Sequence, residues 1–109
     1  MQGYSLLAVA IFCEVIATSC LKLSDGFTKP VPSAITVVFY SISFFALSLT
    51  LKFIPVGVAY AIWSALGIVL ISLVGYVAFG QKLDLAALVG MVLIIVGVLV
   101  ISLISKTAG

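Results

Sequence analysis

The run YSLLAVAIFCEVIATSCL, residues 4–21, decides the fold of this 109-residue chain. It is long and apolar enough to cross a bilayer as a helix. Its one charged side chain is Glu14, which lies near the middle. A charge at the centre of a membrane helix costs about 3 kcal/mol on insertion scales, so such residues usually serve a function. We therefore expect Glu14 to bind a cation, to carry a proton, or to do both.

The composition indicates a membrane protein over the whole length. Apolar residues make up 65% of the chain, charged residues make up 7%, and the mean hydropathy is +1.50. Soluble domains carry about a quarter charged residues. Four apolar runs are long enough to span a bilayer, and short loops force neighbouring helices to run antiparallel. The sequence predicts an all-α membrane protein with one four-helix transmembrane domain, residues 1–109, and spans at about 4–21, 33–51, 56–79 and 86–105.

The lysines are divided almost evenly between the two sides of the predicted membrane. With four spans, Lys22, Lys29 and Lys82 lie on one side, while Lys52, Lys106 and the α-amino group lie on the other. Orientation follows the asymmetry of Lys and Arg between the two sides, and that asymmetry is weak here. We therefore expect insertion in both orientations. Two oppositely inserted copies would form an antiparallel, dual-topology homodimer that contains a pair of Glu14 carboxylates.

The helix face around Glu14 carries small and hydroxylic side chains. At about 100° per residue, Ala10, Ala17 and Thr18 lie close to the direction of Glu14. The two alanines keep access to the carboxylate open, and Thr18 offers a hydroxyl group one turn away. This face is therefore predicted to admit a ligand.

The second and third spans carry aromatic side chains among small or hydroxylic ones. Tyrosine and tryptophan also gather at membrane interfaces, which would account for Tyr4 and Tyr76. Tyr40, Tyr60 and Trp63 lie farther inside their spans, where a role in lining a ligand site competes with plain packing. A carboxylate near aromatic rings suits a hydrophobic organic cation, because the rings add cation–π attraction. These faces comprise Thr36, Tyr40, Ser43, Phe44 and Leu47 on the second span and Tyr60, Trp63, Ser64 and Gly67 on the third.

The remaining signals concern helix contacts and helix ends. Gly90 and Gly97 stand two turns apart on one face of the fourth span, which has no charged or aromatic residue. Small residues at such spacing let membrane helices approach closely, so we expect a dimer contact there. Gly67 is predicted to ease bending of the third helix. Asp84 is placed to cap the start of the fourth helix.

Six segments of the chain carry a resemblance to a known family. They are residues 10–18 (AIFCEVIAT), 21–22 (LK), 26–28 (GFT), 55–64 (PVGVAYAIWS), 80–84 (GQKLD) and the pair Gly90 and Gly97. Together they resemble the small multidrug resistance family over essentially the whole chain, and its quaternary-ammonium branch most closely. One departure is Ala65, where the family often has glycine. If the third helix bends there, Ala65 is expected to stiffen it.

The resemblance implies a bacterial inner-membrane antiporter rather than an enzyme. It implies an antiparallel homodimer that exchanges protons for lipophilic, aromatic cations of the quaternary-ammonium type, with Glu14 binding proton and substrate. Protons would be the coupling ion, with no other cofactor and no nucleic-acid partner. The pocket residues that the resemblance implies are Tyr4, Thr18, Tyr40, Ser43, Phe44, Tyr60, Trp63 and Ser64.

Several alternatives stay open at this point. Within the family, the chain could export guanidinium or polyamines, or form one half of a heterodimeric pair; Tyr4 and Tyr40 favour the multidrug branch. A proton-conducting rotor subunit would usually be a two-helix hairpin, and an assembly subunit would need neither Glu14 nor the aromatic residues. With no histidine in the chain, Cys13 and Cys20 are interpreted as packing residues, and no metal site is expected.

Overall fold

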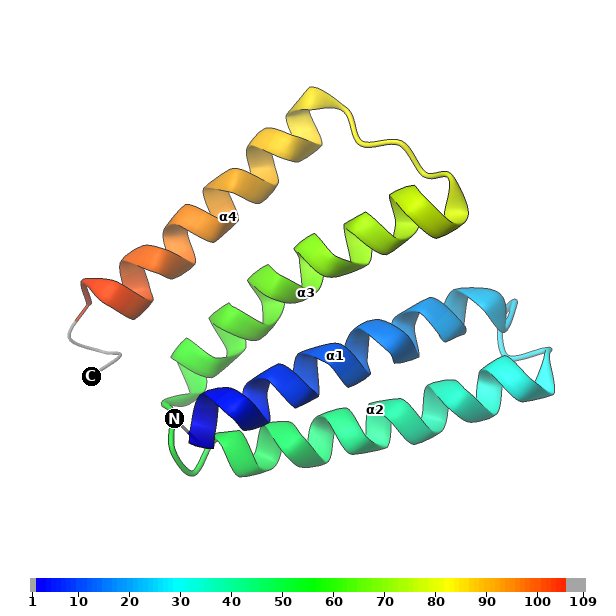
Figure 1. The fold of residues 1–109 in the computed structure, drawn as a ribbon, viewed down its shortest axis with the longest axis horizontal. Coiled ribbons are helices and arrows are strands. Elements are labelled where there is room, and N and C mark those ends of the chain that lie inside the picture. Colours follow the sequence, from blue (N-terminus) through cyan, green and yellow to red (C-terminus); the bar gives the residue numbers. More distant parts are fainter. Residues whose placement is uncertain (1, 106–109) are drawn as a thin grey trace.

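The part of the chain that the structure describes folds into four α-helices joined by short loops (Figure 1). The structure is a computed structural model that describes residues 2–105, so Lys106 lies outside the described residues. The helices are α1 (Gln2–Leu23), α2 (Pro30–Thr50), α3 (Val56–Phe79) and α4 (Leu85–Leu103). Each is long and apolar enough to cross a membrane, which confirms the prediction of an all-helical, four-span chain. α2 begins earlier than expected, at Pro30, because proline is well suited to the first turn of a helix.

The end of α3 and the start of α4 each have a residue that suits a helix terminus. Gly80 follows α3 with φ of +66°, a left-handed conformation that glycine adopts without strain. The Asp84 carboxylate accepts a hydrogen bond from the backbone N–H of Ala87 at 2.8 Å. This contact confirms the predicted cap of α4, because it satisfies a backbone donor that has no partner within the helix.

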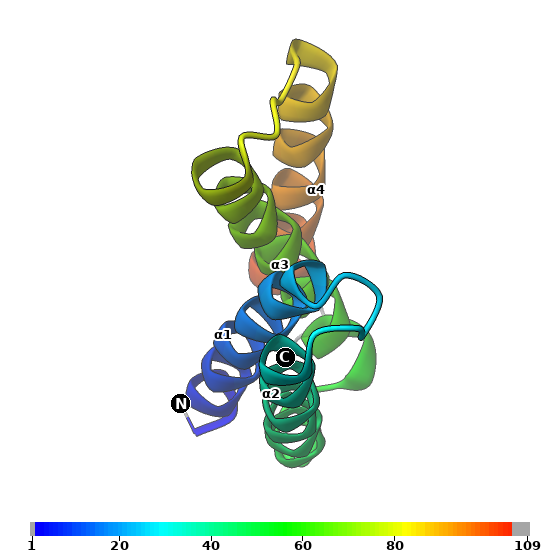
Figure 2. The ribbon, with the colours of Figure 1, turned by 90° about the vertical axis from the view of Figure 1, so that its right-hand side faces the viewer.

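The four helices lie side by side in a thin slab that measures 45 × 35 × 17 Å. Figures 1 and 2 show their order across the slab as α2, α1, α3 and α4. α1 packs along α2, and α3 contacts both α1 and α4. The apolar core lies where α1 meets the start of α3, and it contains Leu7, Ile11, Val15, Ile54, Val58 and Ala59. A slab this thin leaves most of its side chains on one of two broad faces.

Two hydroxyl groups of α2 reach across to backbone carbonyls of α1. The Ser43 hydroxyl donates to the Ala10 carbonyl oxygen at 2.7 Å, and the Thr36 hydroxyl lies 3.3 Å from the Ala17 carbonyl oxygen. All four residues are fully buried. Because an alanine side chain is only a methyl group, the two backbones approach closely enough for these contacts. α1 and α2 are therefore held together by polar as well as apolar contacts.

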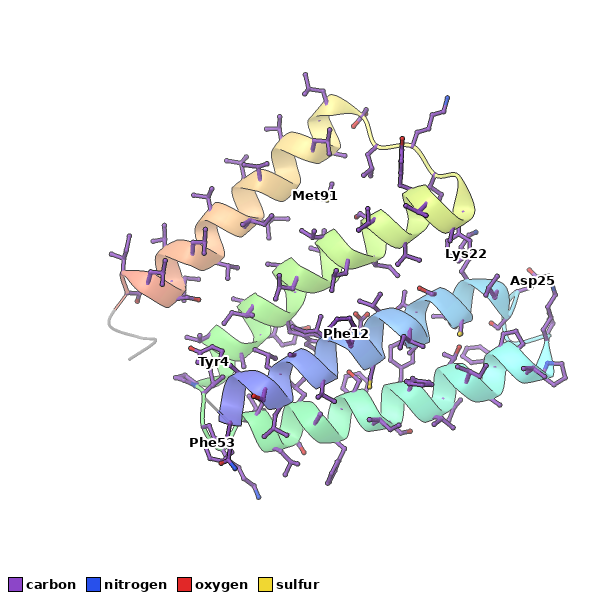
Figure 3. The ribbon with its side chains drawn as sticks, in the orientation of Figure 1. Tyr4, Phe12, Lys22, Asp25, Phe53 and Met91 are labelled. Atoms are coloured by element: carbon purple, nitrogen blue, oxygen red, sulfur yellow. The ribbon has the colours of Figure 1, made fainter. Side chains whose placement is uncertain are left out.

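Each end of α1 is held by a different contact. A Cβ atom at Gly3 would lie 2.9 Å from side-chain atoms of Phe53 and Ile54, so only glycine fits this approach to the loop before α3. At the other end, the Lys22 Nζ lies 5.5 Å from the centre of the Phe79 ring, a cation–π distance (Figure 3). The first contact ties α1 to the loop before α3, and the second ties it to the last residue of α3.

We predict that Ser43→Ala lowers the free energy of unfolding by about 1 kcal/mol, because the substitution removes an interhelical hydrogen bond. Reversible unfolding in mixed detergent micelles, followed by circular dichroism, measures this change. Ser41→Ala is the matched control, since the Ser41 hydroxyl is exposed and donates only to the Val37 carbonyl of its own helix. Equal losses from the two substitutions would contradict a special role for the contact between α1 and α2.

Candidate functional site

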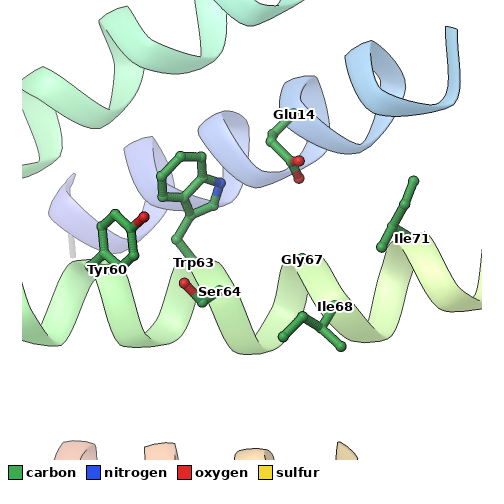
Figure 4. A pocket seen from close by; sticks show the side chains of 7 residues that line it. All are labelled: Glu14, Tyr60, Trp63, Ser64, Gly67, Ile68 and Ile71. Carbon is green, nitrogen blue, oxygen red and sulfur yellow. The ribbon is translucent and has the colours of Figure 1, made fainter. Parts of the chain in front are cut away.

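A cavity of about 300 Å³ opens between α1 and α3, and Glu14 forms one side of it (Figure 4). Glu14 comes from the middle of α1, whereas every other lining residue comes from α3. The helical spacing of α3 places one residue on the cavity at nearly every turn. The α3 lining consists of Tyr60, Trp63, Ser64, Gly67, Ile68 and Ile71.

Among residues 2–105, one oxygen of the Glu14 carboxylate belongs to a series of hydrogen bonds and the other has no hydrogen-bond partner. Thr18 donates its hydroxyl hydrogen to Oε1 of Glu14 at 2.8 Å. The Tyr40 hydroxyl lies 2.6 Å from the Thr18 hydroxyl oxygen. Since Thr18 has only one hydroxyl hydrogen, Tyr40 is the donor in that contact. Within residues 2–105, neither a hydrogen-bond donor nor a lysine is paired with Oε2.

Four aromatic rings form a continuous series beside the hydrogen bonds that join Tyr40, Thr18 and Glu14. The Tyr40 and Phe44 rings are stacked, with centroids 6.1 Å apart. Phe44 meets Trp63 edge to face at 5.8 Å, and Trp63 meets Tyr60 edge to face at 5.4 Å. Tyr60 is 59% exposed and Phe44 is 53% exposed, so both rings keep free surface for a ligand. The series joins α2 to α3 around the carboxylate.

Gly67 lies directly against the carboxylate. A Cβ atom at this position would stand 3.4 Å from Oε2 of Glu14, at the tight edge of ordinary contact. A larger side chain here would therefore displace Glu14 or cover its free oxygen. α3 is one continuous helix through this position, and the predicted bending at Gly67 stays a prediction. Ala65 lies on the other side of α3, where it is buried and away from Glu14.

The structure brings most of the predicted site residues together and places a few elsewhere. Ala10 and Ser43 are buried in the contact between α1 and α2. Tyr4 lines a different groove, between α3 and α4. Gly90 and Gly97 lie on α4, where a Cβ atom would meet nothing within 4 Å. The others line the cavity or lie within two contacts of it: Glu14, Thr18, Tyr40, Phe44, Tyr60, Trp63, Ser64 and Gly67.

Sequence reasoning missed the apolar wall of the cavity, which Ile68 and Ile71 provide. They stand one turn beyond Ser64 and Gly67 on the same face of α3. Helical spacing was the signal that could have found them. Residue type does not mark them, because isoleucine is ordinary in any membrane helix.

Comparison with known proteins gives matches over nearly the whole chain. A family model described as Small Multidrug Resistance protein matches residues 2–94. The chain is 55% identical to the quaternary ammonium compound-resistance protein QacE of Escherichia coli over 108 residues, which are 99% of this chain and 98% of that protein. It is 54% identical to the quaternary ammonium compound-resistance protein QacF of Klebsiella aerogenes, with the same coverage. It is 52% identical to the multidrug transporter EmrE of Escherichia coli (strain K12) over 107 residues, 98% of this chain and 97% of that protein.

These matches agree with the architecture and with the segments that carried the resemblance. Four helices can span a membrane, and the relatives are bacterial transporters and resistance proteins of nearly the same length. The chain is a multi-pass protein of the bacterial inner membrane. Its family model and its full-length identities show that it belongs to the small multidrug resistance family.

Proposed function

We propose that this protein exports lipophilic, aromatic cations of the quaternary-ammonium type in exchange for protons, with Glu14 binding both. The observation that carries the proposal is a carboxylate in a mainly apolar cavity, with one oxygen unpaired among residues 2–105. The relatives' names, a quaternary ammonium compound-resistance protein and a multidrug transporter, support this substrate class.

The lining of the cavity suits a cation that is large and poorly hydrated. The free Oε2 of Glu14 offers a negative charge, and attraction between charges is strong in a region of low dielectric constant. Tyr60 and Trp63 offer aromatic surface for cation–π contact, while Ile68 and Ile71 offer apolar surface for the substituents. These contacts do not demand one fixed geometry, so cations of different shapes fit the same lining.

The exchange of protons for organic cations follows because both bind the same group, the Glu14 carboxylate. A protonated Glu14 is neutral and loses its attraction for the cation, whereas a bound cation favours the ionised carboxylate. The two ligands therefore exclude each other. A cation that binds on the cytoplasmic side releases protons, and protons that enter from outside release the cation after the protein has switched its access.

A second copy of the chain, inserted in the opposite orientation, would complete the site. The slab is only 17 Å thick, and a cavity of about 300 Å³ is at the lower limit for small-molecule sites. A partner on the same face would enlarge the enclosed volume and add a second Glu14. The open surface at Gly90 and Gly97 and the even division of the lysines support such an antiparallel dimer.

We predict that Glu14→Gln reduces pH-driven uptake of tetraphenylphosphonium into proteoliposomes to background, because the amide neither releases a proton nor attracts the cation. Asp25→Asn is the matched control, since it makes the same chemical change in the loop before α2 and should leave uptake intact. Glu14→Asp should retain coupled uptake with an altered pH dependence. Coupled uptake by Glu14→Gln would refute the proposal. If the unsubstituted protein transports guanidinium but does not bind tetraphenylphosphonium, the substrate class is guanidinium and not lipophilic aromatic cations.

We predict that Thr18→Val weakens the equilibrium binding of tetraphenylphosphonium by about tenfold. The Thr18 hydroxyl donates to the Glu14 carboxylate, and a hydrogen bond to a charged group contributes about 1.5–3 kcal/mol. Its loss removes stabilisation from the ionised carboxylate, the form that attracts the cation. Equilibrium binding in detergent at one fixed pH, compared with the unsubstituted protein, measures the loss of affinity. Thr18→Ser, which keeps the hydroxyl, should behave as the unsubstituted protein does; the same loss in both variants would rule out this role.

We predict that a cysteine at position 28 is labelled in intact cells in about half of the molecules. Thr28 is exposed in the loop between α1 and α2, and Cys13 and Cys20 are first replaced by alanine. A membrane-impermeant maleimide measures the outer fraction, and lysis reveals the rest. Asp25→Lys adds a positive charge beside Lys22 and Lys29, so it should shift the population toward one orientation. Labelling of all molecules from a single side would contradict dual topology.

A further inference from the structure

A second groove, of about 390 Å³, lies between α3 and α4 on the side of α3 away from Glu14. At about 100° per residue, its α3 residues face roughly opposite to Ser64, Gly67 and Ile71 of the Glu14 cavity. The volume is within the range of small-molecule sites. The groove is lined by Tyr4, Ile62, Ala65, Leu66, Ile95, Val98, Leu99, Ser102 and Leu103.

The groove is polar at one end only. Ser102 is in the last turn of α4 and Tyr4 is in the first turn of α1, and the antiparallel order of the helices brings these ends to the same side of the membrane (Figures 1 and 3). Tyrosine is favoured at the level where the hydrocarbon meets the headgroups. Toward the middle of the membrane the lining is aliphatic, with Ile62, Leu66 and Ile95.

Ser102 has an unsatisfied hydroxyl. Its Oγ is the one side-chain nitrogen or oxygen atom in residues 2–105 that is buried and lacks a hydrogen-bond partner. Serines elsewhere in these helices, such as Ser19 and Ser41, donate to a carbonyl one turn earlier. An unpaired hydroxyl in an apolar environment costs free energy, so an acceptor from outside the chain is expected beside it.

The length of the groove corresponds to one leaflet of the bilayer. From the start of α3 at Val56 to Leu66 is ten residues, or about 15 Å at 1.5 Å per residue. The hydrocarbon core is about 30 Å thick, so one leaflet contributes about half of that. An occupant that fits has an acceptor at the interface and a flexible apolar chain of leaflet length below it.

We propose that this groove binds one acyl chain of a membrane phospholipid, whose ester carbonyl oxygen accepts a hydrogen bond from the Ser102 hydroxyl. The phospholipid ester groups lie at the level of Tyr4 and Ser102, and the chain extends along Ile62, Leu66 and Ile95. The site thus matches the surrounding lipid in polarity, depth and length.

The lipid site is compatible with the proposed dimer. Gly90 and Gly97 lie about half a turn around α4 from Leu99 and Ile95, so a partner seated on the glycines leaves the groove open to lipid. Neither Ser102 nor Leu99 borders the Glu14 cavity. Cation binding at Glu14 is therefore a separate readout from lipid binding here.

Native mass spectrometry of the purified protein, titrated with phosphatidylethanolamine in detergent, tests the proposal. The ester-linked lipid is compared with its diether analogue, which lacks the two carbonyl groups. The unsubstituted protein should bind the ester lipid roughly two- to tenfold more tightly, the effect of one hydrogen bond. Ser102→Ala should bind both lipids equally. Ser48→Ala, whose hydroxyl donates to the Phe45 carbonyl near the same membrane side, should keep the preference.

A second pair of variants tests whether the acyl chain of the lipid lies in the groove. Leu99→Trp places a large side chain in the groove and should reduce retention of both lipids, whereas Val96→Trp, similarly exposed but outside the groove, should not. Equal binding of ester and diether lipids by the unsubstituted protein, or a preference that survives Ser102→Ala, would overturn the proposal. So would unchanged lipid retention in Leu99→Trp together with loss of dimers, since the groove would then hold a second copy of the chain.

Discussion

The structure depends on one constraint, the need of a carboxylate for partners inside an apolar bundle. Glu14 meets part of this need through Thr18, which Tyr40 supports in turn. The rest of its surroundings consists of rings, isoleucines and the open backbone of Gly67, so Oε2 is left for a ligand. An ordinary buried carboxylate would have both oxygens paired. The incomplete pairing is what distinguishes a binding site from a structural contact, and it is the basis of the proposed exchange.

The four helices, the cap of α4 and the family could be predicted from the sequence because each depends on residues that are close together along the chain. Span length and hydropathy predicted four helices, the N-terminal cap at Asp84 followed from residue type, and the motif around Glu14 identified the family. The placement of individual side chains depends on how the helices pack. Helical spacing places Ser43 on the same face as Tyr40, yet Ser43 is buried against Ala10, since the contact with α1 covers that edge of the face. Tyr4 stands near α3 and α4 because of the way α1 crosses α3, which no local pattern encodes.

The helices contribute unequally to the site. α1 and α2 are joined by buried hydroxyl-to-carbonyl contacts, and they supply the carboxylate with its hydrogen-bonded chain. α3 supplies most of the cavity on one face and a wall of the second groove on the other. A rotation of α3 about its axis would therefore change both cavities together. Such coupling is a consequence of using one helix for two surfaces in a slab that is only 17 Å thick.

α4 has no buried residue, and every one of its residues except Ser102 is apolar. Such a helix gains no hydrophobic free energy from packing within a membrane, because lipid chains are as apolar as its own side chains. Its position must then depend on close backbone approach and on polar contacts. The glycines provide the first at a surface that this chain leaves open, and Ser102 provides the second on the opposite side. Both the close approach at the glycines and the hydrogen bond of Ser102 require a molecule other than the single chain. We therefore propose a partner protomer and a lipid on two different faces of α4.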